Sequence, residues 1–88
     1  MPIIAIFFGI VIRINFFDHA PPHLHAAHGD DEALFDLRTG AIIAGRLPRR
    51  QTQLVPRWIE ENRTDLMRNW DLAVSGQPTF KIKGLSDD

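Results

Sequence analysis

The stretch of chain that decides the fold is Ile10-Val11-Ile12-Arg13-Ile14-Asn15-Phe16-Phe17. Isoleucine occupies every second position at first, and the polar residues Arg13 and Asn15 fall at the positions between. Polar residues at a period of two, among β-branched and aromatic ones, are typical of a strand with one buried face. We therefore predict that a strand runs through residues 10–17.

The neighbouring segments extend this strand into a sheet. The apolar run of residues 3–8, ahead of Gly9, is either the beginning of the same strand with a bulge or a short strand of its own. Further strands are predicted over residues 33–37 and 41–45, because Gly40 between them suits the left-handed position of a short hairpin. Together these segments predict an antiparallel meander of three to four strands.

Two amphipathic helices are expected after the meander. The first is predicted to begin at Pro48, and Pro56 predicts a kink or a restart near Val55, because an interior proline costs about 3 kcal/mol. The second is predicted to open with Thr64 as N-cap and to stop at Gly76. Apolar residues recur at helical spacing in both, namely Leu54, Val55, Trp58 and Ile59 in the first and Leu66, Trp70, Ala73 and Val74 in the second.

The last predicted element is a charged edge strand, in which Phe80 and Ile82 alternate with lysines. The resulting order, β-β-β-α-α-β, predicts an α+β fold with both helices packed on one face of the sheet. A chain of 88 residues suffices for one small domain, which we place at residues 1–85. The acidic residues 86–88 are predicted to form a disordered tail.

Composition excludes several classes of protein. The chain has no cysteine, which rules out disulfides, thiolate zinc sites and thiol nucleophiles, and favours a cytoplasmic location. The apolar segment from Pro2 to Val11 has no basic residue ahead of it and is broken by Gly9, so we expect neither a signal peptide nor a membrane span. A net charge of −1 argues against a protein wrapped in nucleic acid.

All four histidines lie within ten residues, in the segment Asp18-His19-Ala20-Pro21-Pro22-His23-Leu24-His25-Ala26-Ala27-His28. Imidazole is the commonest metal ligand and titrates near neutrality, so this cluster favours either cation binding or proton transfer. Because of its two prolines, we expect the segment to be a stiff loop between the first long strand and the second.

If the chain is extended after Pro22, His23 and His25 point to one side and can reach a single metal ion. His28 has the opposite parity. The third ligand stays open among His19, Asp18 and Asp30, and such a set would suit zinc, nickel, copper or iron. The alternative is a His-x-His pair that hydrogen-bonds backbone groups or stays exposed.

Basic residues gather in the second half of the chain, whereas residues 14–37 contain acidic residues and no Lys or Arg. A candidate surface for phosphate or a partner is formed by Arg46, Arg49, Arg50 and Arg57, at and after the predicted helix start. The alternative is a solvated helix face paired with Glu60, Glu61 and Asp65. The two tryptophans lie in apolar stripes and are predicted to pack in the core.

The chain resembles a family of small bacterial proteins known only as a domain of unknown function. Its most specific part is the block Asp-His-x-Pro-Pro-His-x-His-Ala at residues 18–26, in which His19, His23 and His25 match the family signature. The resemblance implies a compact cytosolic protein, often encoded beside another small protein in an arrangement similar to toxin–antitoxin pairs. No activity and no catalytic residue come with it.

Two functional hypotheses follow. The first is a non-catalytic binding module, whose histidine segment, with or without a metal ion, and arginines contact a small protein, a second copy of the chain or nucleic acid. The second is a small histidine- or metal-dependent ribonuclease-type toxin, in which His23 or His25 acts as acid–base or ligand and Arg49 or Arg50 holds phosphate. The absence of a nucleophile beside the histidines favours the first.

Overall fold

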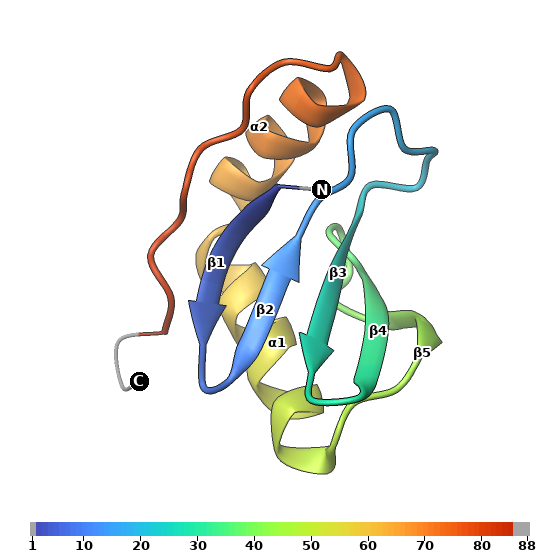
Figure 1. Ribbon diagram of the computed structural model, residues 1–88, viewed down its shortest axis with the longest axis vertical. Coiled ribbons are helices and arrows are strands. Elements are labelled where there is room, and N and C mark those ends of the chain that lie inside the picture. Colours follow the sequence, from blue (N-terminus) through green and yellow to red (C-terminus); the bar gives the residue numbers. More distant parts are fainter. Residues whose placement is uncertain (1, 86–88) are drawn as a thin grey trace.

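The computed structural model describes residues 2–85, which form an antiparallel sheet followed by two helices (Figure 1). The elements are β1 (Ile3–Phe7), β2 (Ile10–Arg13), β3 (His23–His28), β4 (Asp31–Asp36), β5 (Ile42–Gly45), α1 (Arg49–Glu61) and α2 (Arg63–Val74). The predicted α+β class is confirmed. The described part has five strands rather than three to four, because the run before Gly9 is a strand of its own and the histidine segment is another.

The five strands lie side by side in the order in which they occur in the chain, and each neighbouring pair is antiparallel. The predicted hairpin between β4 and β5 is confirmed, with Gly40 at φ 79°. Gly40 also lies against Pro56 of α1, where a β-carbon would be 3.4 Å from that of the proline. The sheet is therefore a simple meander.

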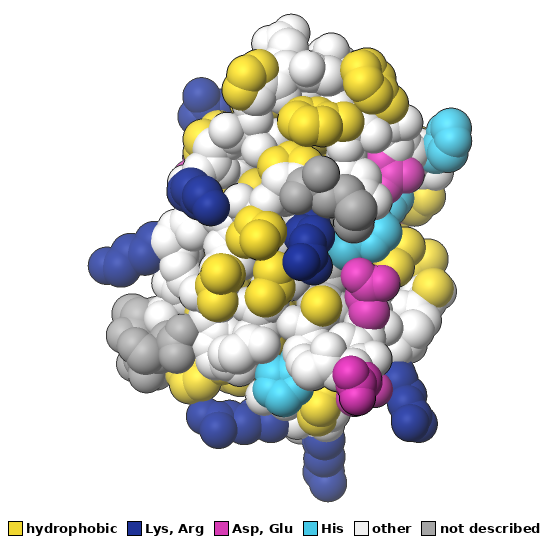
Figure 2. Space-filling view, viewed as in Figure 1, with side chains coloured by type: hydrophobic (Ala, Val, Ile, Leu, Met, Phe, Trp, Pro, Cys, Tyr) yellow, Lys and Arg dark blue, Asp and Glu magenta, His cyan; other side chains and the backbone are white. Residues whose placement is uncertain are grey.

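Both helices cover the same face of this sheet and lie behind it in Figure 1. Ile12 and Ile14 are fully buried on the covered side, so Arg13, between them, belongs to the other side. The cross-strand pairing assigns further residues to that uncovered side, which we call the open face: Ile6, Val11, Arg13, His25, Ala27 and Leu34. Figure 2 shows histidine and acidic side chains beside one another on this face.

Residues 23–28 of the histidine segment form β3, so the prediction of a loop is wrong for this half of the segment and is confirmed for residues 18–22. Leu24 and Ala26 are fully buried against the core, and the alternation directs His23 and His25 to the other side. The two prolines precede the strand and stiffen only residues 14–22, the actual β2–β3 loop, in which the Ala20–Pro21 bond is cis. The strand predicted over residues 10–17 correspondingly ends at Arg13.

Helix α1 runs without interruption through Pro56, so the predicted restart near Val55 does not occur. Val55, Trp58 and Ile59 are fully buried on both sides of the proline. This burial outweighs the cost of about 3 kcal/mol for an interior proline. Pro48 is the N-cap and not the first helical residue.

Helix α2 begins with Asn62 as N-cap in place of Thr64, and one member of its predicted buried face, Val74, is exposed. The helix ends as predicted before Gly76, which has φ 72°. The Gly76 N–H donates to the Ala73 carbonyl and the Gln77 N–H to that of Leu72, the pairing of a Schellman cap. Neither described helix is long and apolar enough to cross a membrane.

The chain after α2 is extended but is not a strand, contrary to the prediction for Phe80 and Ile82. The Ile82 N–H donates to the Ile4 carbonyl of β1, at 2.8 Å, yet side chains hold the segment as well. Asn69, fully buried, both donates to the Phe80 carbonyl and accepts from the Phe80 N–H, each at 2.9 Å. The Trp58 indole N–H donates to the Lys83 carbonyl. The predicted tail, residues 86–88, lies outside the described residues.

Replacing Asn69 by alanine should loosen this segment. The change leaves the backbone N–H and carbonyl of Phe80 without their partner, and we expect the free energy of unfolding to fall by about 2–3 kcal/mol. Urea denaturation measures the loss. Gln53→Ala, at an exposed position of α1, is the control and should change stability by less than about 0.5 kcal/mol. Equal stability of the two variants would refute this role of Asn69.

Candidate metal centre

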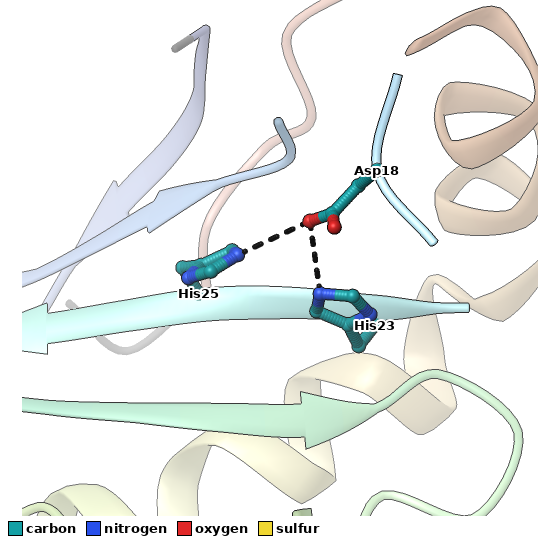
Figure 3. Close-up of side chains that lie close together, drawn as sticks. All are labelled: Asp18, His23 and His25. Carbon is teal, nitrogen blue, oxygen red and sulfur yellow. Dashed lines mark hydrogen bonds and ion pairs between the residues drawn. The ribbon is translucent and has the colours of Figure 1, made fainter. Parts of the chain in front are cut away.

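Three side chains that can bind metal meet beside the beginning of β3 (Figure 3). Asp18 comes from the β2–β3 loop, and His23 and His25 come from β3. Oδ2 of Asp18 lies 3.0 Å from Nε2 of His23 and 3.5 Å from Nε2 of His25. One donor atom of each side chain lies within 4.8 Å of the other two. We call these residues the Asp-His-His cluster.

The strand geometry of β3 brings the two imidazoles together. They are two positions apart, so they project to the same side, and their ring centroids are 5.3 Å apart. The expectation that both point to one side is confirmed. His23 also contacts Trp70 of α2, with 5.2 Å between ring centroids, and its side chain is only 9% exposed. The cluster therefore lies at the junction of the sheet and α2, shielded from most water.

A backbone hydrogen bond orients the His23 ring. Its Nδ1 lies 2.7 Å from the Pro21 carbonyl oxygen. A carbonyl only accepts, so Nδ1 carries the hydrogen and Nε2 is the atom presented to Asp18. Histidines that bind metal through one nitrogen usually donate the other N–H to a carbonyl or carboxylate in this way.

The loop holds Asp18 through contacts on both sides of it in the chain. The Phe17 N–H donates to the Ala73 carbonyl at the end of α2, at 2.9 Å, and the Phe17 ring fills the space where a β-carbon on Gly76 would lie. The His19 backbone N–H donates to Oδ1 of Asp18 at 2.8 Å. Because Oδ1 is engaged there, Oδ2 is the oxygen turned toward the imidazoles (Figure 3).

Asp18 is held in its anionic form. Burial acts to raise the pKa of this carboxyl group, but the His19 N–H and the attraction to His23 and His25 outweigh it. The net result is a pKa below the ordinary value of 3.8. A carboxylate is thus available at neutral pH, in the protonation state that a metal ligand requires.

Two further residues border the cluster, Arg13 at the end of β2 and Asn15 in the loop that follows. The Asn15 side-chain nitrogen lies 3.1 Å from Nε2 of His25, while its oxygen is buried and has no hydrogen-bond partner among residues 2–85. Arg13 is the cross-strand partner of His25. Neither residue was predicted as part of a site. Their period-two spacing could have indicated that both point to the same side as the histidines. That inference requires knowing that residues 23–28 form the strand next to β2.

The structure does not bring the remaining candidate ligands into the cluster. His19 is exposed and contributes its backbone N–H, not its ring. His28, at the far end of β3, has the opposite parity and lies beside Gly9. Asp30 is exposed in the turn between β3 and β4. Of the three residues left open as third ligand, Asp18 is the one that faces the histidines.

The predicted basic surface lies away from the cluster. Arg46, Arg49 and Arg50 are exposed around the start of α1, and Arg57 pairs with Glu61 at 3.7 Å. The Arg50 guanidinium lies 5.0 Å from the ring centre of Phe8, in the turn that adjoins His28. His28 and His23 are opposite ends of β3, so roughly 17 Å separates that turn from the cluster. Two surface hollows also lie elsewhere, at the α1–α2 junction and along α2.

Comparison with known proteins places the chain in a family. The model of a domain of unknown function, DUF4160, matches residues 9–71, which include β2, the whole cluster and most of both helices. The chain therefore belongs to this family. No curated protein and no solved structure matches it significantly.

The Asp18→Asn variant tests the electrostatics of the cluster. Folding lowers the pKa of Asp18, so the carboxylate stabilises the fold above its unfolded pKa and loses that effect as the pH falls through its lower folded pKa. We expect the variant to be less stable by about 1–2 kcal/mol at pH 6. The difference should vanish in strong acid.

Urea denaturation at a series of pH values from neutral to strongly acidic measures this difference. Asp30→Asn removes the same charge from an exposed turn and is the control. Because Asp30 lies outside the cluster, this variant should not show the loss of stability expected of Asp18→Asn. A gap between wild type and Asp18→Asn that persisted at the lowest pH would show that the charge of Asp18 is not what stabilises the site.

Proposed function

We propose that this protein is a small binding module whose Asp-His-His cluster holds one divalent transition-metal ion. The observation that carries the proposal is the convergence of Oδ2 of Asp18 with Nε2 of His23 and His25, all within 4.8 Å of one another. Tetrahedral zinc with bonds of about 2.0–2.1 Å has ligand atoms roughly 3.3 Å apart. The two contacts to Asp18, 3.0 and 3.5 Å, lie on either side of that value.

The positions of the hydrogens on the His23 ring support a cation in the cluster. With hydrogen on Nδ1, a neutral His23 presents a lone pair at Nε2 to a carboxylate oxygen 3.0 Å away. Two lone pairs at that distance repel unless a proton or a metal ion lies between them. Without a metal ion, a proton on Nε2 of each histidine is needed to join both rings to this oxygen, because Nε2 of His25 faces it as well. A single metal ion would engage all three atoms at once.

The surroundings of the cluster fit a bound ion. The buried Asn15 oxygen lacks a partner among the described residues, and a water on the metal would be a hydrogen-bond donor beside it. Two imidazoles and one carboxylate suit zinc, nickel or iron better than calcium or magnesium. The metal would hold the β2–β3 loop on β3, and it would supply a Lewis acid with a free coordination position.

A binding role is better supported than the ribonuclease-type alternative. That alternative needs Arg49 or Arg50 to hold phosphate beside His23 or His25, but these arginines lie at the other end of the sheet. Neither the loop nor the strand places a nucleophilic side chain in the cluster.

The exposed arginines around the start of α1 support a separate basic contact surface. The Arg50 guanidinium lies over the Phe8 ring. Arg46 and Arg49, close to Arg50 in the chain, are exposed. A partner protein of the kind that the family resemblance implies, or nucleic acid, would meet three positive charges there. The proposed module thus has two distinct binding surfaces.

Zinc titration tests the proposal directly. Untagged protein, prepared without a nickel column, should bind one equivalent of Zn²⁺ in isothermal titration calorimetry. Replacing His23 or His25 by alanine removes a ligand and should weaken binding by at least roughly 100-fold, since loss of a mere supporting group costs 10–100-fold. Affinity should also fall on acidification, because histidine ligands must be deprotonated.

His19→Ala and His28→Ala are matched controls, each removing one imidazole that lies outside the cluster. Both should bind zinc as the wild type does. No zinc uptake by the folded wild type, or equal losses in all four histidine variants, would overturn the proposal.

A further inference from the structure

Arg13 stands next to the Asp-His-His cluster on the open face. It pairs directly with His25 across β2 and β3. Side chains at such paired positions project to the same side with their Cβ atoms about 4.5–5.5 Å apart. Figure 2 shows a Lys or Arg side chain beside the histidines on this face. The pairing therefore puts the candidate metal centre within reach of the Arg13 side chain.

The Arg13 guanidinium has no partner among the described residues. Arg13 is half-buried, between the fully buried Ile12 and Ile14, yet it makes no side-chain hydrogen bond, ion pair or ring contact within residues 2–85. Other described arginines are engaged, for example Arg63 with the Leu37 carbonyl and Arg68 with Asp65. The five N–H donors of Arg13 are thus used by no described residue and are available to a ligand.

The charges around the cluster leave a positive excess. A divalent ion, the Asp18 carboxylate and Arg13 sum to +2. The next carboxylate, Asp36, is paired with His23 across β3 and β4, but it is committed to the adjoining turn. Its Oδ1 accepts the backbone N–H groups of Arg38 and Thr39, at 2.7 and 3.2 Å, and lies 4.0 Å from Nε of Arg38, whose positive charge offsets that of the carboxylate. A dianion would neutralise the excess, whereas a carboxylate ligand would neutralise only half of it.

We infer that the metal-loaded cluster and Arg13 together bind a phosphate group, either free or as a monoester. The inference rests on the proposed metal site. Three protein ligands leave at least one position of a four-coordinate metal for a phosphate oxygen. The guanidinium fork of Arg13 matches two further oxygens of the same group. The phosphate would lie on the open face, bridging the metal and β2.

Calorimetric titration with inorganic phosphate tests the inference. The protein is loaded with one equivalent of zinc, freed of excess metal, and compared with the metal-free protein. We expect phosphate to bind the zinc form and to bind the metal-free form at least tenfold more weakly. Arg13→Gln should weaken phosphate binding to the zinc form at least roughly tenfold, while its zinc affinity holds or rises because a repelling charge is gone.

Lys81→Gln removes an equal charge from an exposed position after α2, outside both proposed binding surfaces, and should bind phosphate as the wild type does. Glycerol phosphate binding as tightly as inorganic phosphate would identify a monoester site, and weaker binding would identify a site for the free ion. Equal phosphate affinity of Arg13→Gln and wild type, or acetate binding as tightly as phosphate, would overturn the inference while leaving the metal site intact. Failure of zinc to bind at all would overturn both.

Discussion

The alternation of side chains along β3 is the constraint on which the rest of this structure depends. Helices cover only one side of the sheet, so Leu24 and Ala26 must face the core, and His23 and His25 are directed away from it. A shift of one residue in register would turn both imidazoles toward the core and the apolar side chains away from it. The apolar packing of the core thus fixes the spacing of the two imidazoles of the candidate metal centre, whether or not a metal ion is bound.

The third member of the Asp-His-His cluster is positioned by a contact of a different kind. Asp18 is in a loop, where the sheet exerts no control, and the end of α2 supplies the anchor through the Phe17 N–H and the Gly76 surface under the Phe17 ring. Trp70 of the same helix packs on His23. Helix α2 therefore supports both halves of the cluster, and loss of its packing would separate the carboxylate from the imidazoles.

Short-range patterns in the sequence predicted the features that depend on residues close together in the chain. The α+β class, the glycine turn before β5, the burial of Trp58 and Trp70, and the common direction of His23 and His25 all follow from periodicity or turn chemistry. Two prolines and four histidines suggested a loop where burial of Leu24 and Ala26 makes a strand. Cross-strand partners such as Arg13 could not be predicted, because pairing joins residues far apart in the chain. The same limit applies to Asn69. Its side chain makes the backbone hydrogen bonds to Phe80 that a neighbouring strand would make if the predicted final strand existed.

The most direct test of this account is a crystal of untagged protein soaked in zinc, with anomalous diffraction recorded at the zinc absorption edge. The account predicts one strong peak about 2.0–2.2 Å from Oδ2 of Asp18 and from Nε2 of both His23 and His25. A peak only at His19 or His28, or no peak in a crystal whose three side chains keep their present positions, would contradict it.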